Sequence, residues 1–326
     1  MEVRTTLTGP FPRSEELVQA TRDLDRGRQS PEAVEEVYAR TEAGVVDLER
    51  RLGTDRCTAG YLRWADLFRP ISESWGGFAV GPLTRWFETN TFYRQPILHA
   101  PPERTPGAIA SRLPLPLRGD GAARALVVLP GPYTLAGLLD NRSGEAPQAI
   151  IHRLGRLLAE EVRELRGLGY RSFEWAEPLL VTRIPTGPSA ESTVEAYRGI
   201  HEVAGDSTSI VWTYFGDAAP ALPLLTRLPV SVIGVDLAET DPASLEVGLN
   251  GRAIGLGVID PRTTLNEDPG EVARIVRRLQ ERTKPREVWL GNGAPLDLLP
   301  AEPAAKKLHL LAAARIALIP PSGGRS

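Results

Sequence analysis

The sequence predicts a (β/α)₈ barrel, an α/β fold of the TIM-barrel type, with an insertion between its second and third strands. Eight short apolar segments recur along the chain, and each closes on glycine, proline or a polar residue before a helical stretch. Alternating strands and helices indicate a parallel sheet, and barrel active sites lie at the C-terminal ends of the strands. The predicted strands cover residues 3–9, 56–60, 125–131, 171–177, 209–214, 231–236, 253–259 and 287–291.

The third strand and the helix after it show this pattern most clearly. Residues 125–129 form a continuous apolar run that stops at Pro130 and Gly131, as expected of a strand buried on both faces. Residues 149–168 carry their apolar side chains on one face and end near Gly169, which predicts an amphipathic helix. Further helices are predicted after the sixth, seventh and eighth strands, over residues 242–249, 269–279 and 302–314.

The length of the chain predicts one domain with an insertion. Its 326 residues exceed the roughly 250 that are typical of such a barrel. Residues 61–121 show no clear strand–helix unit and are rich in proline, tryptophan and arginine. We therefore expect a single domain over residues 1–326, in which residues 61–121 cover the barrel mouth or form an interface.

Composition narrows the classes of partner. With 38 basic and 41 acidic residues, the formal charge of −3 argues against a nucleic-acid surface and favours a small-molecule substrate. No stretch approaches the roughly 18 apolar residues of a membrane span. The single cysteine, Cys57, excludes an intrachain disulfide, and no apolar leader segment stands at the N-terminus. These features predict a cytoplasmic protein.

Carboxylates stand at the ends of several predicted strands. Glu177 ends the fourth strand and Asp236 ends the sixth, where burial could tune either side chain for acid or base catalysis. Glu177 could equally be a structural residue paired with an arginine. Asp260 and Arg262 follow the seventh strand, and they suit either a charged or polyol substrate or a turn with an internal ion pair.

The insertion carries a second group of candidate residues. Tyr61, Trp64 and Asp66 lie in a short segment that also contains two arginines, and aromatic faces beside cations suit a flat heterocyclic or anionic ligand. The alternative is an amphipathic helix that packs Trp64 and Phe68 inward. Asn90 belongs to a polar and aromatic segment, residues 89–96, that fits a strand or a loop equally well.

The sequence does not indicate a metal site or a nucleophile. The four histidines are far apart, and none lies at a predicted strand end. Cys57 falls within the second strand, where it is best interpreted as a small buried apolar residue. Neither a phosphate-binding glycine loop nor a serine nucleophile elbow is present in the sequence.

Several strand-end segments, in this order, resemble the cobalamin-independent methionine synthase family, whose members are built from related barrels. The Thr-Tyr-Phe-Gly and Leu-Pro-Val segments are more similar to the family's N-terminal, zinc-free barrel than to its catalytic C-terminal barrel. The matching segments are Thr5-Thr-Leu-Thr-Gly-Pro-Phe-Pro-Arg13, Thr89-Asn90, Leu129-Pro-Gly-Pro-Tyr-Thr134, Glu177-Pro178, Thr213-Tyr-Phe-Gly216, Leu228-Pro-Val230 with Val235-Asp236, and Gly257-Val-Ile-Asp260.

The resemblance implies that zinc is absent from this chain. In the family's catalytic half a His-x-Cys pair, a glutamate and a second cysteine hold zinc, which activates the thiol of homocysteine. The His-x-Cys positions fall here on Val211 and Thr213, the glutamate falls on Asp236, and the second cysteine falls on or near Asn292. No metal ligand set is therefore expected.

The family's amino-acid pocket is changed as well, so recognition of homocysteine should be lost. Its Ile-Gly-Ser segment becomes Leu7-Thr-Gly-Pro10, its glutamate after the second strand falls on Tyr61, and its Asp-Glu-Pro segment is Ala176-Glu-Pro178.

Three functional hypotheses follow. The first is a methyltransferase-family enzyme that takes a methyl group from a reduced folate or a corrinoid and passes it to an altered acceptor, with Glu177 or Asp236 as base. The second is a non-catalytic, N-terminal-type subunit that pairs with a separate zinc-bearing methionine synthase barrel. The third is a lyase of the uroporphyrinogen decarboxylase type, which would use Arg13, Arg63 and Arg69. The predicted substrate-binding residues are Arg13, Tyr61, Trp64, Asp66, Asn90, Tyr214, Asp260, Arg262 and Asn292.

Overall fold

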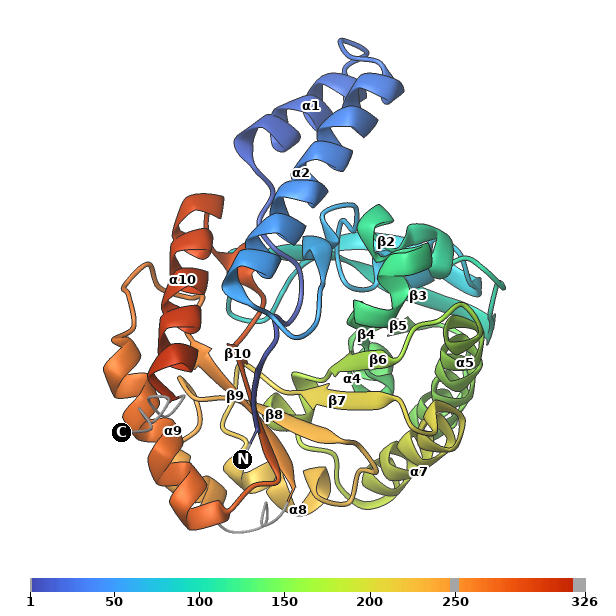
Figure 1. The fold of residues 1–326 in the computed structure, drawn as a ribbon. Helices are drawn as coiled ribbons and strands as arrows, with labels where there is room; N and C mark the ends of the chain where they lie inside the picture. The colour runs from blue at the N-terminus through green and yellow to red at the C-terminus, as the bar shows by residue number, and fades with distance from the viewer. Residues whose placement is uncertain (1, 247–251, 319–326) are drawn as a thin grey trace.

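The computed structural model describes residues 2–246 and 252–318 and confirms the barrel (Figure 1). Within these residues a seven-stranded parallel sheet runs in the order β1-β10-β9-β8-β7-β6-β4. All the predicted strands except the second overlap a strand of this sheet. The strands are β1 (Glu2–Thr5), β4 (Val127–Pro130), β6 (Ser172–Ala176), β7 (Thr208–Trp212), β8 (Val232–Asp236), β9 (Ala253–Ile259) and β10 (Glu287–Asn292).

A short segment takes the place of the second barrel strand. The amide of Asp55 donates to the carbonyl of Thr5 at 2.9 Å, and Cys57 forms a parallel bridge with Ala125 at the entry to β4. The predicted strand over residues 56–60 shrinks to this bridge because the chain turns sharply after it, with positive φ angles from Ala59 to Tyr61. Residues 55–57 thus link the two edge strands, β1 and β4.

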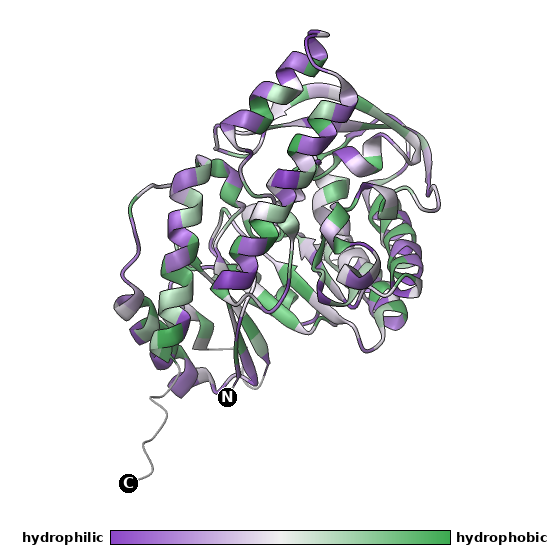
Figure 2. Cartoon of the chain, turned by 45° about the horizontal axis from the view of Figure 1, so that its top comes forward, coloured by the Kyte–Doolittle hydropathy of each residue, from purple (hydrophilic) through white to green (hydrophobic). Residues whose placement is uncertain are grey.

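Helices cover the outside of the sheet, and Figure 2 shows hydrophobic strands surrounded by helices of mixed hydropathy. The predicted helices over residues 149–168, 269–279 and 302–314 are confirmed as α5, α9 and α10. The predicted helix over residues 242–249 is a 3₁₀ turn at Pro242–Glu246, and the rest of it lies outside the described residues. The helices after the strands are α4 (Pro132–Leu138), α5 (Pro147–Gly167), α6 (Leu179–Thr182), α7 (Gly187–Ala204), α8 (Leu222–Leu225), α9 (Pro269–Thr283) and α10 (Ala301–Leu318).

Two helices between β1 and the 55–57 segment project from the barrel as an antiparallel pair (Figure 1). They are α1 (Glu15–Asp25) and α2 (Pro31–Leu52), and each begins at a serine whose hydroxyl accepts an amide of the first turn. Gly53 ends α2 with a φ of 68°, a left-handed conformation that glycine adopts without strain.

The insertion forms a second, smaller sheet. β2 (Gly76–Arg85) and β3 (Phe92–Glu103) make an antiparallel hairpin, and β5 (Asp140–Asn141) pairs with β3 in parallel. Ahead of the hairpin, turns precede the short α3 (Arg69–Ser72), so the predicted amphipathic helix over residues 61–69 does not form. Trp64 and Phe68 are nevertheless buried.

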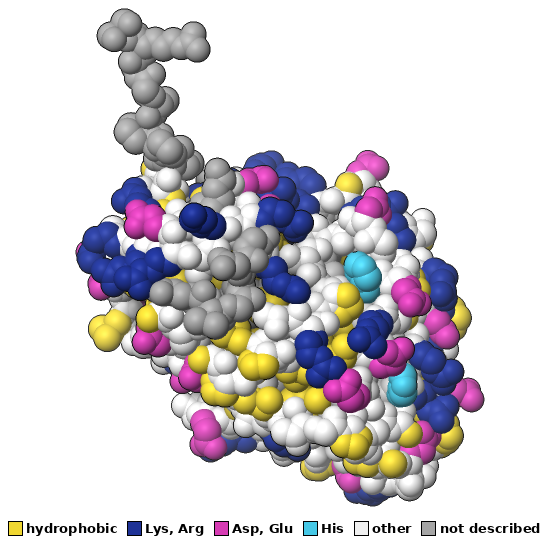
Figure 3. Space-filling model, turned by 90° about the horizontal axis from the view of Figure 1, so that it is seen from below, with side chains coloured by type: hydrophobic (Ala, Val, Ile, Leu, Met, Phe, Trp, Pro, Cys, Tyr) yellow, Lys and Arg dark blue, Asp and Glu magenta, His cyan; other side chains and the backbone are white. Residues whose placement is uncertain are grey.

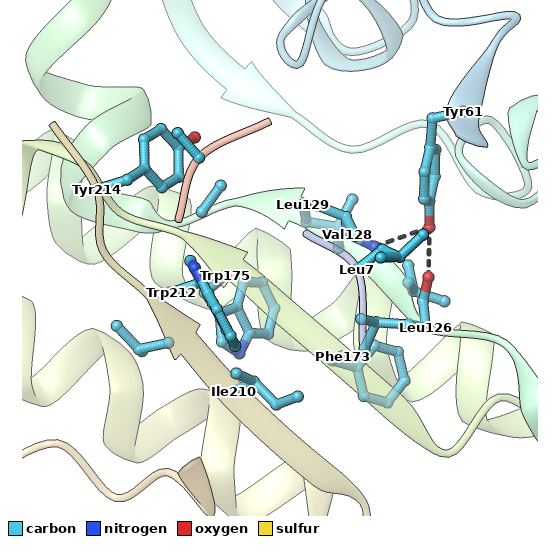
Figure 4. Close-up of a cluster of buried hydrophobic side chains, with 14 of the residues drawn as sticks. Leu7, Tyr61, Leu126, Val128, Leu129, Phe173, Trp175, Ile210, Trp212 and Tyr214 are labelled. Atoms are coloured by element: carbon cyan, nitrogen blue, oxygen red, sulfur yellow. Dashed lines mark hydrogen bonds between the residues drawn. The ribbon is translucent and has the colours of Figure 1, made fainter. Parts of the chain in front are cut away.

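A tryptophan from β7 fills the barrel interior. A Cβ atom added at Gly234, Gly255 or Gly291 would lie 2.4, 2.7 or 3.0 Å from the ring of Trp212. These glycines belong to β8, β9 and β10, so three neighbouring strands lack a side chain where the indole lies. Figure 4 shows Trp212 among other buried side chains of the core. The barrel is therefore a packed core rather than a channel.

The surface carries charges of both signs. On the face seen in Figure 3, acidic, basic and hydrophobic side chains are interspersed. Among the described residues, no helix is long and apolar enough to cross a membrane.

Candidate functional site

A cleft of about 510 Å³ lies at the C-terminal ends of the barrel strands. The turn of the β2–β3 hairpin forms one wall, and the loops after β6, β7, β8, β9 and β10 form the rest. Its volume lies in the usual range for small-molecule sites, about 300 to 1,000 Å³. The lining residues are Phe87, Glu88, Thr89, Asn90, Thr91, Thr182, Phe215, Glu239, Arg262 and Leu298.

Two phenylalanines meet across this cleft in strained backbone conformations. Phe87 comes from the hairpin turn and Phe215 from the loop after β7, and their ring centroids are 5.2 Å apart. Their φ angles are 48° and 68°, in the left-handed region that non-glycine residues rarely adopt. Such conformations persist only where the surrounding structure enforces them, and they cluster at ligand sites.

Asp236, Asp260 and Arg262 come together at one side of the mouth. Arg262 Nε lies 2.7 Å from Asp260, and its Nη1 lies 3.1 Å from Asp236 and 2.5 Å from Glu239. Burial raises the pKa of Asp236 to about 6, against the lowering effect of the Arg262 guanidinium. Arg262 and Glu239 face the cleft, while Asp236 is buried behind them.

A buried lysine holds the loop after β9, which carries Asp260 and Arg262. Lys307 of α10 is fully buried, and its Nζ donates to the carbonyl of Leu265 at 2.5 Å and to Glu267 Oε1 at 2.6 Å. The same carboxylate oxygen accepts the amide of Asp260 at 2.9 Å. Lys307 thereby fixes the position of the segment that carries Asp260 and Arg262.

Glu177 is placed away from the cleft. Its carboxylate accepts the amides of Tyr133 and Thr134 at 3.1 and 2.8 Å and the hydroxyl of Tyr197 at 3.0 Å. It thus holds the start of α4 against the barrel, and no arginine pairs with it among the described residues. Burial raises its pKa to about 7 although these donors act in the opposite direction.

Two further predicted residues bond to the backbone. The Asn292 amide donates to the carbonyls of Thr8 and Ala294 at 2.8 and 2.7 Å, and its oxygen accepts the Thr8 amide at 3.0 Å. The hydroxyl of Tyr61 bridges Leu126 and Val128 on either side of one residue of β4 (Figure 4). The side chains of Asn292 and Tyr61 are both buried, and their polar atoms are occupied by these hydrogen bonds.

Arg13 and Trp64 also contact the backbone. Arg13 donates to the carbonyls of Leu62 and Trp64 at 2.8 and 3.3 Å, and the Trp64 indole donates to that of Arg112 at 2.7 Å. The Arg13 contacts link the loop after β1 to the start of the insertion, and the Trp64 contact links that start to a later part of the insertion.

The other arginines of the decarboxylase hypothesis have acidic partners. Arg63 pairs with Glu35 and Glu42, and Arg69 pairs with Asp66 and Glu73.

A smaller pocket of about 50 Å³ lies beside the cleft and shares Thr91 with it. Two predicted residues, Asp66 and Tyr214, line this inner pocket. Asp66 accepts the amides of Phe68, Arg69 and Arg94. The lining residues are Gly9, Pro10, Ala65, Asp66, Leu67, Trp86, Thr91, Phe92, Tyr93, Ala176, Tyr214, Pro295 and Asp297.

Two carboxylates near the barrel mouth were not predicted from the sequence. Asp297 lines the inner pocket, five residues beyond the end of β10, and burial raises its pKa to about 7. Glu174 is fully buried on β6 and accepts the hydroxyl of Thr8, and burial raises its pKa to about 8. Glu174 could have been identified from the sequence, because it is a charged residue in the middle of an apolar strand. Asp297 could not, because it lies too far beyond the end of its strand.

The residues to which the resemblance assigns the family's zinc positions do not fit zinc. Val211 has no donor atom, and Thr213 Oγ1 donates to the carbonyl of Gly234 at 2.9 Å. Asp236 is paired with Arg262, and Asn292 is saturated by backbone groups. Across the part of the chain that the structure describes, no group of three or more His, Cys, Asp and Glu side chains is arranged to hold a metal ion.

Residues 78–284 match the family model described as the N-terminal domain of cobalamin-independent synthase. The chain belongs to this family. The methionine synthase of Sulfolobus acidocaldarius is 26% identical over 314 residues, which cover 93% of this chain and 88% of that protein. The 5-methyltetrahydropteroyltriglutamate–homocysteine methyltransferase of Mycobacterium tuberculosis is 33% identical over 213 residues, or 62% of this chain and 27% of that protein.

Solved structures of the cobalamin-independent family share the fold. A B12-independent methionine synthase from Shewanella in complex with selenomethionine superposes with a TM-score of 0.73 at 15% identity, covering 96% of each chain. A putative vitamin-B12 independent methionine synthase from Listeria monocytogenes gives 0.70 at 15% identity, covering 97% of this chain and 99% of that one.

Proposed function

We propose that this chain is a zinc-free, N-terminal-type barrel that binds a reduced methyl-folate in its mouth cleft and works with a separate zinc-bearing methionine synthase barrel. One observation carries the proposal: an open cleft persists at the mouth, while no residue at the family's zinc positions is free to bind zinc. The family match to an N-terminal domain supports the same assignment of folate binding to this chain and of zinc to a separate barrel.

The lining of the cleft suits a flat heterocycle with polar edges. Phe87 and Phe215 offer aromatic surface, and Asn90, Glu239 and Arg262 offer hydrogen-bond partners around it. A relative is named for a methyltetrahydropteroyltriglutamate substrate, and the family is independent of cobalamin. Both facts favour a reduced folate over a corrinoid as the ligand. The single cysteine, Cys57, supports a reducing cytoplasm as the setting.

Calorimetric titration with 5-methyltetrahydrofolate tests the binding step. Phe87→Ala removes half of the aromatic pair, and we expect it to weaken binding about tenfold, since stacking on an aromatic side chain contributes about 1 to 3 kcal/mol. Ile316→Ala on α10 is the matched control, because Ile316 is exposed and does not line the cleft. Equal affinity for both variants would refute the placement of the folate.

A methyl-transfer assay tests whether this chain needs a separate zinc-bearing barrel. Methyl transfer from the folate to homocysteine should be absent with this chain alone and should appear when a zinc-bearing barrel is added. Efficient transfer by this chain alone would contradict the proposal.

A second candidate function keeps catalysis in this chain, with an acceptor other than a thiol. The specific observation in its favour is Asp236, whose raised pKa of about 6 suits a general base at neutral pH. Asp236 would take a proton from the acceptor as the methyl group arrives. Asp236→Asn should then abolish turnover of that acceptor and leave folate affinity unchanged, whereas loss of folate affinity would identify a purely structural role.

A further inference from the structure

A further pocket, of about 330 Å³, lies within the insertion and shares no lining residue with the mouth cleft. Its walls come from the turns before α3, from α3 and the residue after it, and from the segment that follows β3. Four of the residues that line this arginine pocket are arginines, and one is acidic. The lining residues are Arg63, Trp64, Ala65, Arg69, Pro70, Glu73, Ser111, Arg112 and Arg118.

Most acidic partners of these arginines stand outside the pocket. Arg63 pairs with Glu35 and Glu42 of α2, and neither glutamate lines the pocket. Arg69 lies 3.4 Å from Asp66, which lines the inner pocket instead. The cluster is therefore balanced by carboxylates on its outer side, while the walls of the pocket present mainly positive charge.

Glu73 is the carboxylate that lines the pocket, and it leaves donors of two guanidinium groups unused. Its two oxygens lie 2.9 Å from Arg69 Nη1 and 2.7 Å from Arg112 Nη1. Within the described residues, the buried Nε of Arg69 makes no hydrogen bond, and Nη1 is the one guanidinium nitrogen of Arg112 that makes any. Since each guanidinium carries five N–H donors, both groups can still bind a ligand.

Arg118 is held in place without a counterion. Its Nε and Nη2 donate to the carbonyl of Leu113 at 2.9 and 2.6 Å, and Nη2 also donates to that of Ser111. Among the described residues Arg118 forms no ion pair, and the carboxylate that it influences, that of Glu35, is already paired with Arg63. Backbone carbonyls fix the orientation of the group and leave its charge uncompensated, which is a pre-organised arrangement for an anion.

The geometry points to a binding site for a phosphate group in the arginine pocket, held by Arg69, Arg112 and Arg118. A guanidinium presents its N–H groups as a planar fork that matches phosphate oxygens, and the charges strengthen these hydrogen bonds. A phosphate group offers three acceptor oxygens for the three arginines. A cation would be repelled here, and an apolar ligand would remove water from the guanidinium groups without replacing its hydrogen bonds.

The size of the pocket admits more than a free ion. A volume of about 330 Å³ lies at the lower end of the range for small-molecule sites, about 300 to 1,000 Å³. Trp64 adds an aromatic wall, and its indole donates to the carbonyl of Arg112 at 2.7 Å, which ties that wall to the arginine segment. The phosphate group therefore comes from inorganic phosphate or from a small organic phosphate.

This site goes beyond the proposed folate function and does not depend on it. The folate is assigned to the mouth cleft, and the two pockets share no lining residue. Folate binding and phosphate binding can each fail without the other.

Calorimetric titration at constant ionic strength tests the site. The probes are inorganic phosphate, glycerol 3-phosphate and, as a monovalent oxyanion, nitrate. We expect both phosphates to bind saturably and nitrate to bind at least about tenfold more weakly, because it carries less charge to pair with the arginines. Tighter binding of glycerol 3-phosphate than of phosphate identifies an organic phosphate as the ligand, and equal or weaker binding identifies the free ion.

Arg112→Gln and Arg118→Gln each remove one guanidinium group, and each should weaken phosphate binding about tenfold, as a lost charged hydrogen bond implies. Arg142→Gln is the matched control, because Arg142 is also an exposed arginine with an acidic partner, Asp140, and does not line the pocket. It should change phosphate affinity by less than about twofold.

Three results would overturn the site: no saturable phosphate binding, equal affinity for nitrate and phosphate, or unchanged phosphate affinity in both pocket variants. The nitrate comparison uses the unaltered chain, so it decides even if a variant does not fold.

Discussion

Among the described residues, three carboxylates on or directly after the barrel strands are buried, and each has a different set of partners. Glu177 accepts two amides and a hydroxyl, and Asp236 faces the guanidinium of Arg262. Glu174 accepts only the hydroxyl of Thr8, and its second oxygen has no partner among the described residues. The partners, more than the burial they share, decide whether each carboxylate is structural or can take part in chemistry.

Glu174 should make the protein less stable as pH rises. Its pKa is raised from 4.5 to about 8, so the folded state holds this proton more tightly than the unfolded state does. The stabilisation is complete below about pH 4.5 and is lost as pH rises through about 8. Glu174→Gln keeps the acceptor for Thr8 and cannot ionise, so it should gain about 1 to 3 kcal/mol over the wild type at pH 9.

Urea unfolding at pH 5 and pH 9 measures this difference. Parallel loss of stability in the wild type and in Glu174→Gln would show that other groups cause the pH dependence.

At the scale of elements, the interior depends on glycine in three adjacent strands. Gly234→Ala places a Cβ atom 2.4 Å from the Trp212 ring, and such overpacking destabilises a protein by about 1 to 3 kcal/mol. The double variant Gly234→Ala/Trp212→Leu relieves the clash and should recover part of the loss. Chemical unfolding compares the variants, and strictly additive effects would argue against direct contact between the two positions.

The contact between α10 and the loop after β9 is a second test of element packing. Lys307→Met leaves the Glu267 carboxylate without its cation, and we expect a loss of about 3 kcal/mol in the free energy of unfolding. Lys306→Met is the matched control, since Lys306 is adjacent and exposed. Thermal unfolding of both variants decides: similar small changes would mean that the buried pair does not stabilise the loop.

The hydropathy pattern and the glycine and proline residues between segments were enough to predict most helices and strands of the barrel. Buried parallel strands such as β4 are continuous apolar runs, and α5 carries a regular apolar stripe, so both follow from local sequence. The β2–β3 hairpin was missed because its strands contain prolines and polar residues and pair mostly with each other. The residual second strand could not be predicted, since it depends on the backbone turn at Ala59–Tyr61.

The candidate site was predicted less completely than the fold. The sequence placed Asp236 at one strand end and Asp260 and Arg262 after the next, without showing whether they meet. The structure brings the three together, because neighbouring parallel strands end at the same edge. The same rule cannot show that Glu177 and Asn292 are held by other groups of the protein, since most of those partners come from distant parts of the chain. Asp297 was missed because it lies five residues beyond the end of β10, and only the fold places it in the lining of the inner pocket.

At the scale of the whole molecule, the chain combines a packed barrel with a hairpin that forms one wall of the mouth. The family match spans residues 78–284, which include all but the first two residues of this hairpin and the sheet from β4 to β9. The site that results has aromatic walls and a cluster of charges, and the residues to which the resemblance assigns the family's zinc positions lack a donor atom or already have partners. This arrangement supports the proposal that the chain binds the ligand and that a separate barrel activates the thiol.

The measurement that tests this account most directly is calorimetric titration of the chain with 5-methyltetrahydrofolate, before and after exhaustive treatment with a zinc chelator. We predict saturable binding of equal affinity in both samples, and no methyl transfer to homocysteine by this chain alone in either. Absence of folate binding would contradict the account, and so would homocysteine methylation that the chelator abolishes and added zinc restores.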